Sequence, residues 1–228
     1  MKKILLSLAI VLAYILPANA ELTRAIGLTV SNATIDSTVK DDIDSNGTTN
    51  TTKEITNDIS YGSIFLEFTN ENVGPGSVTF GLDLIPASAE FDSRSTTQTS
   101  CKAKAAGACA QESGTNKGTV DVSNHATLYV QPGITLGGMT VFATLGYVAA
   151  DVDAVVQSVS STNKTESGTL EGIKTGLGVK KDFGNDMFMK LEYAQTDYDD
   201  ISVTTSNNTK VSADIDNSGL NFSIGKQF

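Results

Sequence analysis

The 228-residue sequence predicts an all-β protein, namely an eight-stranded antiparallel up-and-down transmembrane β-barrel. Three observations lead to this fold. Apolar residues alternate with small or polar residues in eight segments, long polar connections alternate with short turns, and the final apolar segment runs to the last residue. Because successive side chains of a strand point to opposite faces, each of these segments would have one oily face and one polar face.

The eight segments share a spacing of two between their apolar residues, and they lie at about residues 23–34, 59–71, 78–84, 122–134, 141–147, 173–180, 187–193 and 217–228. In the last segment Leu220, Phe222, Ile224 and Phe228 fall on one face. An oily terminal strand is a liability on the edge of a soluble sheet. In a barrel closed within a membrane the same strand pairs on both sides, and its apolar face meets lipid.

The connections between these segments alternate strictly in length. Residues 35–57, 92–119, 153–168 and 196–213 read as long polar loops, whereas residues 71–76, 137–138 and 182–186 read as tight turns. Short periplasmic turns and long extracellular loops give a membrane barrel this asymmetry. A soluble β-sandwich, the competing fold, has no reason to place every long loop at one end.

The first twenty residues read as a cleavable signal peptide. Lys2 and Lys3 precede an apolar run over 4–16, and Ala18-Asn-Ala20 provides a small-residue cleavage site. The run is too short for a membrane-spanning helix. We therefore expect a signal peptide at 1–20 and an outer-membrane β-barrel domain at 21–228. The formal net charge of −10 argues against nucleic acid as a partner.

Two cysteines, Cys101 and Cys109, lie close together in a polar segment and are expected to form a local disulfide in an oxidising compartment. A metal site would need further ligands near them, and we expect no metal and no cofactor. Residues 42–47 match the first half of a calcium-binding loop but lack its bidentate glutamate, so a solvated acidic loop is the favoured interpretation.

If the apolar faces meet lipid, the polar faces line the interior. This assigns six charged residues to a polar network in the lumen: Glu67, Asp83, Lys174, Lys180, Lys190 and Glu192. An eight-stranded interior is just wide enough for side chains to fill. We expect these residues to form a polar plug of paired charges, with a narrow ion path as the alternative.

The signal peptide, the eight alternating segments, the Gly137-Gly138 turn leading into residues 142–147, and the terminal Phe228 together resemble small bacterial outer-membrane β-barrels of the OmpA-like and opacity-protein kind. This resemblance implies a location in the cell outer membrane and a non-enzymatic structural or surface-interaction role through long acidic extracellular loops. It also implies outer-membrane lipid and lipopolysaccharide as partners, and recognition of the strand ending in Phe228 by the barrel-assembly machinery. A narrow, porin-like passive channel is the alternative function.

Some barrels of this kind modify lipid A, which raises the question of whether His125 is catalytic. Ser123 and His125 are two positions apart and would share one face of a regular strand. Acid–base chemistry would require them to lie within hydrogen-bonding reach, together with an orienting carboxylate. We expect a hydrogen-bonded histidine near the rim and no catalytic residue.

Overall fold

The computed structural model describes residues 22–42, 51–73, 76–103, 109–158, 161–204 and 210–228. The predicted signal peptide and most of the half calcium loop lie outside these residues. No helix within the described ranges is long and apolar enough to cross a membrane. Ten β-strands account for nearly all of the described residues: β1 Leu22–Asp42, β2 Thr51–Val73, β3 Gly76–Ile85, β4 Ala89–Ala103, β5 Cys109–Leu136, β6 Met139–Ser158, β7 Ser161–Phe183, β8 Met187–Tyr198, β9 Ile201–Thr204 and β10 Lys210–Gln227.

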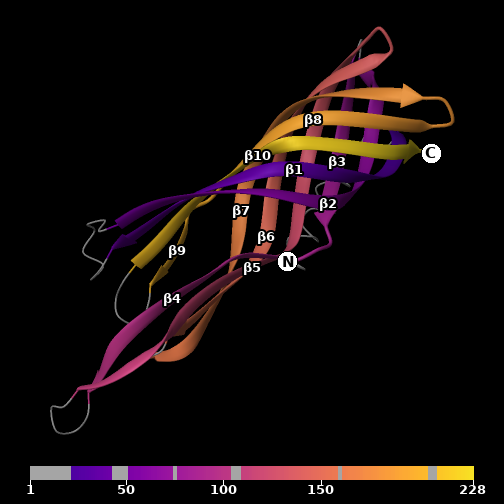
Figure 1. Ribbon diagram of the computed structural model, residues 1–228. Coiled ribbons are helices and arrows are strands. Elements are labelled where there is room, and N and C mark those ends of the chain that lie inside the picture. The colour runs from indigo at the N-terminus through magenta and orange to yellow at the C-terminus, as the bar shows by residue number, and fades with distance from the viewer. Residues whose placement is uncertain (1–21, 43–50, 74–75, 104–108, 159–160, 205–209) are drawn as a thin grey trace. The chain divides into compact units, whose positions relative to one another are not determined.

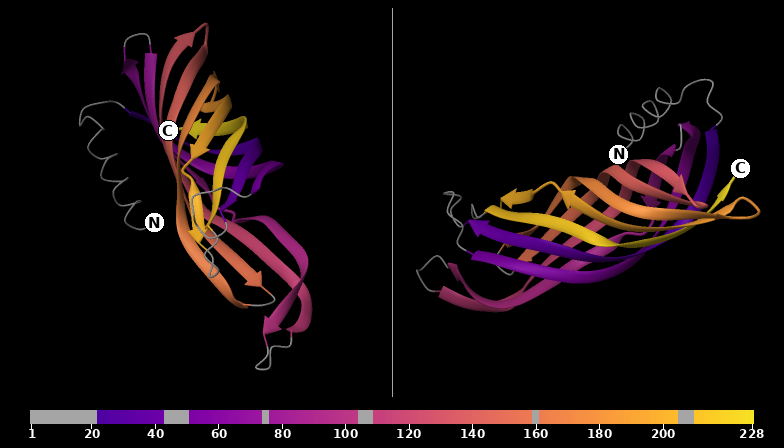
Figure 2. Two further views of the ribbon diagram at one scale, coloured as in Figure 1. Left: turned by 90° about the vertical axis from the view of Figure 1, so that its left-hand side faces the viewer. Right: turned by 90° about the horizontal axis from the view of Figure 1, so that it is seen from above.

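Eight of these strands form a closed antiparallel ring. Hydrogen-bonded neighbours follow the order β1-β2-β3-β5-β6-β7-β8-β10, and β10 pairs again with β1 (Figure 1). The closing seam extends to the last residue, where the amide of Phe228 donates to the Arg24 carbonyl at 2.9 Å. The further views show β10 lying beside both β1 and β8 (Figure 2). The prediction of an eight-stranded up-and-down barrel is confirmed.

The described chain divides into two compact units. The first unit contains the barrel strands and comprises the described residues of 22–86, 125–149 and 170–228. The second comprises 87–124 together with the described residues of 150–169. Within it, β4 pairs with the first half of β5 from Ala89↔Val122 to Ala103↔Cys109.

The outward face of the barrel is apolar, and its inward face is largely polar. Leu28 and Leu177 are 57% and 69% exposed, although both are large aliphatic residues. Glu67 and Lys190, on the alternate face, are only 3% and 6% exposed. This arrangement inverts that of a soluble protein and suits a barrel surrounded by hydrocarbon. Together with Leu28 and Leu177, these exposed apolar side chains of the outward face make up an outer belt: Ile26, Val30, Ile64, Leu66, Leu84, Ile134, Val141, Leu145, Ile173, Leu191, Tyr193, Leu220, Phe222 and Ile224.

The prediction that residues 35–57, 92–119, 153–168 and 196–213 are unpaired loops is wrong for most of their length. The β1–β2 ladder continues to Asp41↔Thr51, and most of the β4–β5 ladder, from Arg94↔Gly118 to Ala103↔Cys109, lies within a segment read as loop. Hydroxyl and carboxylate side chains join neighbouring strands along this extension, as where Thr34 Oγ1 donates to Asp58 at 2.7 Å. In the β1–β2 extension, apolar residues such as Ile35 and Ile55 fall on the opposite face from the belt residues Leu28 and Ile64. The alternation of the belt therefore does not continue into the extension.

Two of the three predicted short turns are confirmed, and the centre of the third, residues 74–75, lies outside the described residues. Gly137 and Gly138 have φ values of 60° and 82°, the left-handed conformation that a two-residue hairpin turn requires at both positions. The turn between β7 and β8 likewise places Asn185 and Asp186 at positive φ. Asparagine and aspartate tolerate this region better than other non-glycine residues do.

Three aspartates lie side by side across neighbouring strands on the outward face, beyond the apolar belt. Asp216 of β10 is the register partner of both Asp36 of β1 and Asp197 of β8. Partial desolvation, and then the neighbouring carboxylates of Asp197 and Asp214, raise the pKa of Asp216 above its ordinary value. Like charges directly opposite one another destabilise a ladder. At neutral pH these three carboxylates therefore destabilise the extended part of the ladders that β10 forms with β1 and β8.

We predict that Asp216→Asn stabilises the extended β1–β10 ladder at neutral pH. Because the folded-state pKa is raised, the folded state binds the proton more tightly, and stability falls as pH rises through that pKa. Hydrogen-exchange protection of the amides around Asp36 and Asp216 should therefore increase in the variant at about pH 7 and match wild type at about pH 3. Asp58→Asn, which alters a carboxylate bonded to Thr34, provides the control. Equal protection of wild type and D216N at pH 7 would contradict this interpretation.

Candidate functional site: the barrel interior

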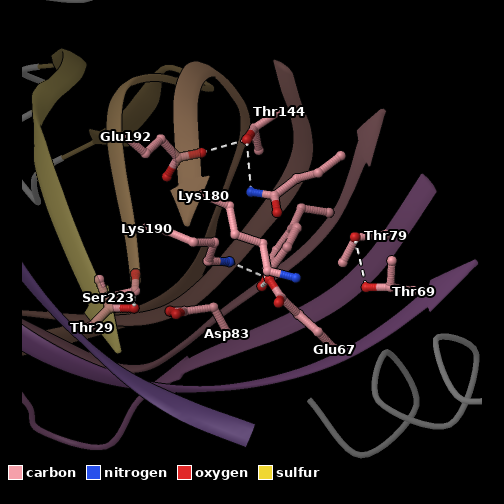
Figure 3. A network of polar contacts seen from close by, with 12 residues as sticks. Thr29, Glu67, Thr69, Thr79, Asp83, Thr144, Lys180, Lys190, Glu192 and Ser223 are labelled. Atoms are coloured by element: carbon pink, nitrogen blue, oxygen red, sulfur yellow. Dashed lines mark hydrogen bonds and ion pairs between the residues drawn. The ribbon is translucent and has the colours of Figure 1, made fainter. Parts of the chain in front are cut away.

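The interior contains an ion pair between two strands that are not neighbours. Lys190 of β8 pairs with Glu67 of β2, and both side chains are buried (Figure 3). Tyr129 of β5 donates its hydroxyl proton to the same Glu67 oxygen, Oε1, at 2.7 Å. Buried charges of this kind are stable only when they are paired and hydrogen-bonded. The group therefore crosslinks three strands that are not all neighbours.

A second cluster surrounds Glu192 of β8. Lys174 of β7 pairs with Glu192 Oε2 at 3.1 Å, and the Asn221 amide donates to the same oxygen at 2.9 Å. Thr144 donates its hydroxyl to Oε1 of this carboxylate and accepts a proton from the Gln131 amide at 2.9 Å (Figure 3). Both carboxylate oxygens of Glu192 are thus occupied by donors from neighbouring strands.

Aromatic rings lie among these charges on the inward face. The Phe65 and Phe188 rings have centroids 6.1 Å apart, and the Lys190 ammonium lies 4.6 Å from the Phe65 ring centre. Lysine and an aromatic face attract each other at this separation. Phe65, Phe142 and Phe188 point inward together with the charged residues, so the interior is not wholly polar.

Glycines opposite the rings provide the space for them. Gly27 is the register partner of Phe65, and Gly225 is the partner of Phe188. A Cβ atom added at these glycines would lie 2.3 Å from the Phe65 ring and 2.4 Å from the Phe188 ring. Pairing a large ring with a glycine on the adjacent strand fills a narrow barrel without forcing the strands apart.

Two cavities lie within the described interior of the barrel. A cavity of about 50 Å³ borders Asp83, Lys174, His125 and Tyr198. A larger cavity of about 490 Å³ lies toward the short turns and borders Lys180, Thr69, Thr79 and Gly138. Gln131, Phe142 and Lys190 line both cavities. The layer containing Lys190 therefore separates them.

The six charged residues assigned to the lumen all contribute to this interior, but in different ways. Asp83 lies apart from the two ion pairs and accepts a hydrogen bond from the Ser63 hydroxyl at 2.7 Å. Lys180 contacts the half-exposed carboxylate of Asp182 at 3.4 Å, and its ammonium lies over the Phe188 ring. Lys180 thus belongs to the mouth of the larger cavity, whereas Lys174 and Lys190 belong to the buried network.

The surroundings of His125 do not form a catalytic arrangement among the described residues. Its Nε2 lies 3.1 Å from the Tyr198 hydroxyl, and no carboxylate is bonded to the ring. Asn124 has a left-handed φ of 54°, which interrupts the regular alternation that would place Ser123 and His125 on one face. The Asn124 amide, not the histidine, donates to Asp151 at 3.0 Å.

Cys101 lies in β4, and Cys109 begins β5. Their side chains fall outside the described part of the structure, so the disulfide between them stays a prediction. Within the described residues, no group of three or more histidine, cysteine, aspartate or glutamate side chains is arranged to hold a metal ion.

The fold and the interior define a class: a closed antiparallel β-barrel with an apolar exterior and a hydrogen-bonded polar interior. No protein-family model matches the chain, and no curated protein matches it in sequence. Among solved structures, the barrel is similar to the outer membrane protease OmpT from Escherichia coli, with a TM-score of 0.51 and 8% identity over 93% of this chain and 99% of that one. That score supports the barrel fold.

Weaker structural similarity is found to Ail, the attachment invasion locus protein of Yersinia pestis, determined in complex with the heparin analogue sucrose octasulfate. The TM-score is 0.38 with 13% identity, over 87% of this chain and 99% of that one. Neisserial surface protein A gives a TM-score of 0.35 with 11% identity, over 90% of this chain and 99% of that one. At these scores the two similarities carry no argument about function.

We predict that Lys190→Met destabilises the barrel by about 3–5 kcal/mol, because it leaves the Glu67 carboxylate buried without its cation. Adding Glu67→Gln should recover most of this loss, since the neutral amide still accepts the Tyr129 hydroxyl proton. Urea unfolding of the protein in lipid vesicles provides the measurement.

Lys180→Met serves as the matched control for this prediction. Its partner Asp182 is half exposed, and exposed ion pairs contribute only about 0–1 kcal/mol. A double variant as unstable as Lys190→Met alone would show that the loss comes from packing and not from the unpaired charge.

Proposed function

We propose that the protein is an integral β-barrel of a Gram-negative-type outer membrane, exported through a cleaved signal peptide at residues 1–20. The exposed belt of aliphatic and aromatic side chains around a polar interior carries this proposal. Exposing so large an apolar belt to water would be unfavourable, whereas hydrocarbon solvates it. The closed ring also leaves no unpaired strand edge within the belt.

We further propose that the role of the protein is structural or surface-interacting and does not involve catalysis. The extended ladders beyond the apolar belt present exposed acidic side chains, including Asp36, Asp58, Asp197 and Asp216. They are stiffened by cross-strand bonds such as that from Thr56 Oγ1 to Asp36 at 2.7 Å. Paired strands hold such side chains in fixed positions, which suits recognition of a partner at the cell surface.

The interior supports a closed plug more than a conducting path. The Lys190–Glu67 pair and the Phe65 and Phe142 rings lie between the two cavities, so ions would have to displace a buried ion pair to pass. The larger cavity leaves a narrow passive channel as the second candidate, since only the layer between the cavities would need to rearrange.

Conductance in planar bilayers separates these two functions. The wild-type protein should be electrically silent, because its lumen charges are paired and its rings are packed. Discrete conductance in wild type that changes in Lys174→Ala or Glu192→Ala would favour the channel.

Membrane location is tested most sharply by two arginine substitutions on the same face of β1. Leu28 is 57% exposed within the apolar belt, and Asn32 is exposed at the edge of the belt, where its register partner is Leu220. In a lipid-facing belt Leu28→Arg should cost about 2–4 kcal/mol, whereas Asn32→Arg should cost about 0–1 kcal/mol. The measurement is reversible unfolding in lipid vesicles, with gel mobility before and after boiling as the readout of the folded barrel.

A water-exposed sheet predicts the opposite result. There, replacing an exposed leucine by arginine would be close to neutral, and the protein would remain in the aqueous fraction without detergent. Equal stability of the two arginine variants, or fractionation with the soluble proteins, would therefore reject the membrane location.

A further inference from the structure

Exposed charged side chains lie on the outward face at both ends of the barrel. At the end with the short turns the outward cations are Arg24 of β1, Lys181 of β7 and Lys226 of β10, all three exposed. We call these three residues the basic collar. At the other end the outward face of β1 and β10 carries the carboxylates of Asp36 and Asp216, and beyond them the exposed Lys40 of β1.

Each collar residue stands directly beside an apolar side chain at the lower edge of the belt. Lys226 is the register partner of Ile26 and of Met187, and Lys181 is the partner of Met189. Arg24 is paired in register with Phe68. The long aliphatic stems of lysine and arginine can cover such residues while the charge reaches toward the polar boundary of a bilayer.

The carboxylates nearby do not neutralise the collar. Asp182 faces the interior side of β7, where its Oδ1 lies 3.4 Å from the Lys180 ammonium and accepts from the Gln227 amide at 3.5 Å. Glu71 lines the larger cavity. Asp186 lies in the β7–β8 turn, and no ion pair joins it to a collar residue in the described structure. The three cations are thus available to an external anion.

The collar residues are also grouped around the barrel. They lie on three of the four consecutive strands β7, β8, β10 and β1. The strand between Lys181 and Lys226 contributes the outward side chains of Met187 and Met189. The result is a band of positive charge immediately adjoining an apolar surface, along one side of the barrel.

We propose that the basic collar binds the phosphate groups of anionic phospholipids in the leaflet at the short-turn end. This inference rests on the proposed membrane location. An anionic phospholipid matches both parts of the surface: its phosphate lies at the depth of the cations, and its acyl chains lie against the apolar belt. A soluble polyanion would match the charges but not the belt beside them.

The test uses the full mature barrel in phosphatidylcholine vesicles containing spin-labelled phosphatidylglycerol or spin-labelled phosphatidylcholine. Electron paramagnetic resonance gives the relative association constant of the two lipids at the barrel surface. Wild type should prefer phosphatidylglycerol by about two- to fivefold at about 0.1 M salt, and the preference should fall toward one at about 1 M salt.

The triple variant Arg24→Gln/Lys181→Gln/Lys226→Gln should bind the two lipids equally. Lys40→Gln, which removes an exposed lysine at the opposite end of β1, should retain the preference. A triple variant that still prefers phosphatidylglycerol would overturn the proposal, as would a Lys40→Gln variant that loses the preference.

Gel mobility before and after boiling, measured on the same vesicles, separates this inference from the proposed function. A barrel that is heat-modifiable in vesicles but shows no lipid preference retains the membrane location and loses the collar as a phosphate site. Failure of wild type to insert at all would overturn both.

Discussion

The pairing of the first barrel strand with the last is the contact on which the rest of the structure depends. β1 and β10 remain in register from Ala25↔Gln227 to Asp42↔Lys210, and the terminal amide of Phe228 completes the seam at Arg24. Without that seam the sheet would have two open edges, whose backbone groups hydrocarbon cannot solvate. With it, the apolar faces are free to point outward and the polar faces inward.

Inside the closed barrel, the buried charged side chains have ion-pair and hydrogen-bond partners. Glu67 and Glu192 each receive a lysine and at least one neutral donor, so neither carboxylate depends on a single partner. Phenylalanine rings occupy the space that the charged groups leave, and they contact the ammonium groups directly. In the layer between the two cavities, this mixture of charged groups and rings fills the barrel, and it limits what could pass through.

The sequence predicted the eight strands and their sidedness because a period of two is visible wherever one face is oily. It missed the extensions of β1 and β2 because the alternation of the belt breaks there. The belt face continues with polar residues such as Asp36 and Thr56, whereas Ile35 and Ile55 lie on the opposite face. It identified Lys190 and Glu67 as interior residues but did not identify them as partners. They belong to β8 and β2, which are not neighbours, and their meeting depends on the stagger of the closed sheet.

The glycine–aromatic pairs bear on how a repetitive barrel selects one alignment of its strands. A slip of one residue would expose polar side chains to lipid, but a slip of two would leave the inside and outside faces unchanged. Phe65 opposite Gly27 and Phe188 opposite Gly225 distinguish these cases, because a two-residue shift would set each ring against a side chain in place of a gap. These pairs would therefore select the correct register during assembly. A barrel misaligned by two residues would still present its apolar faces to lipid, but its rings would have no gap to occupy.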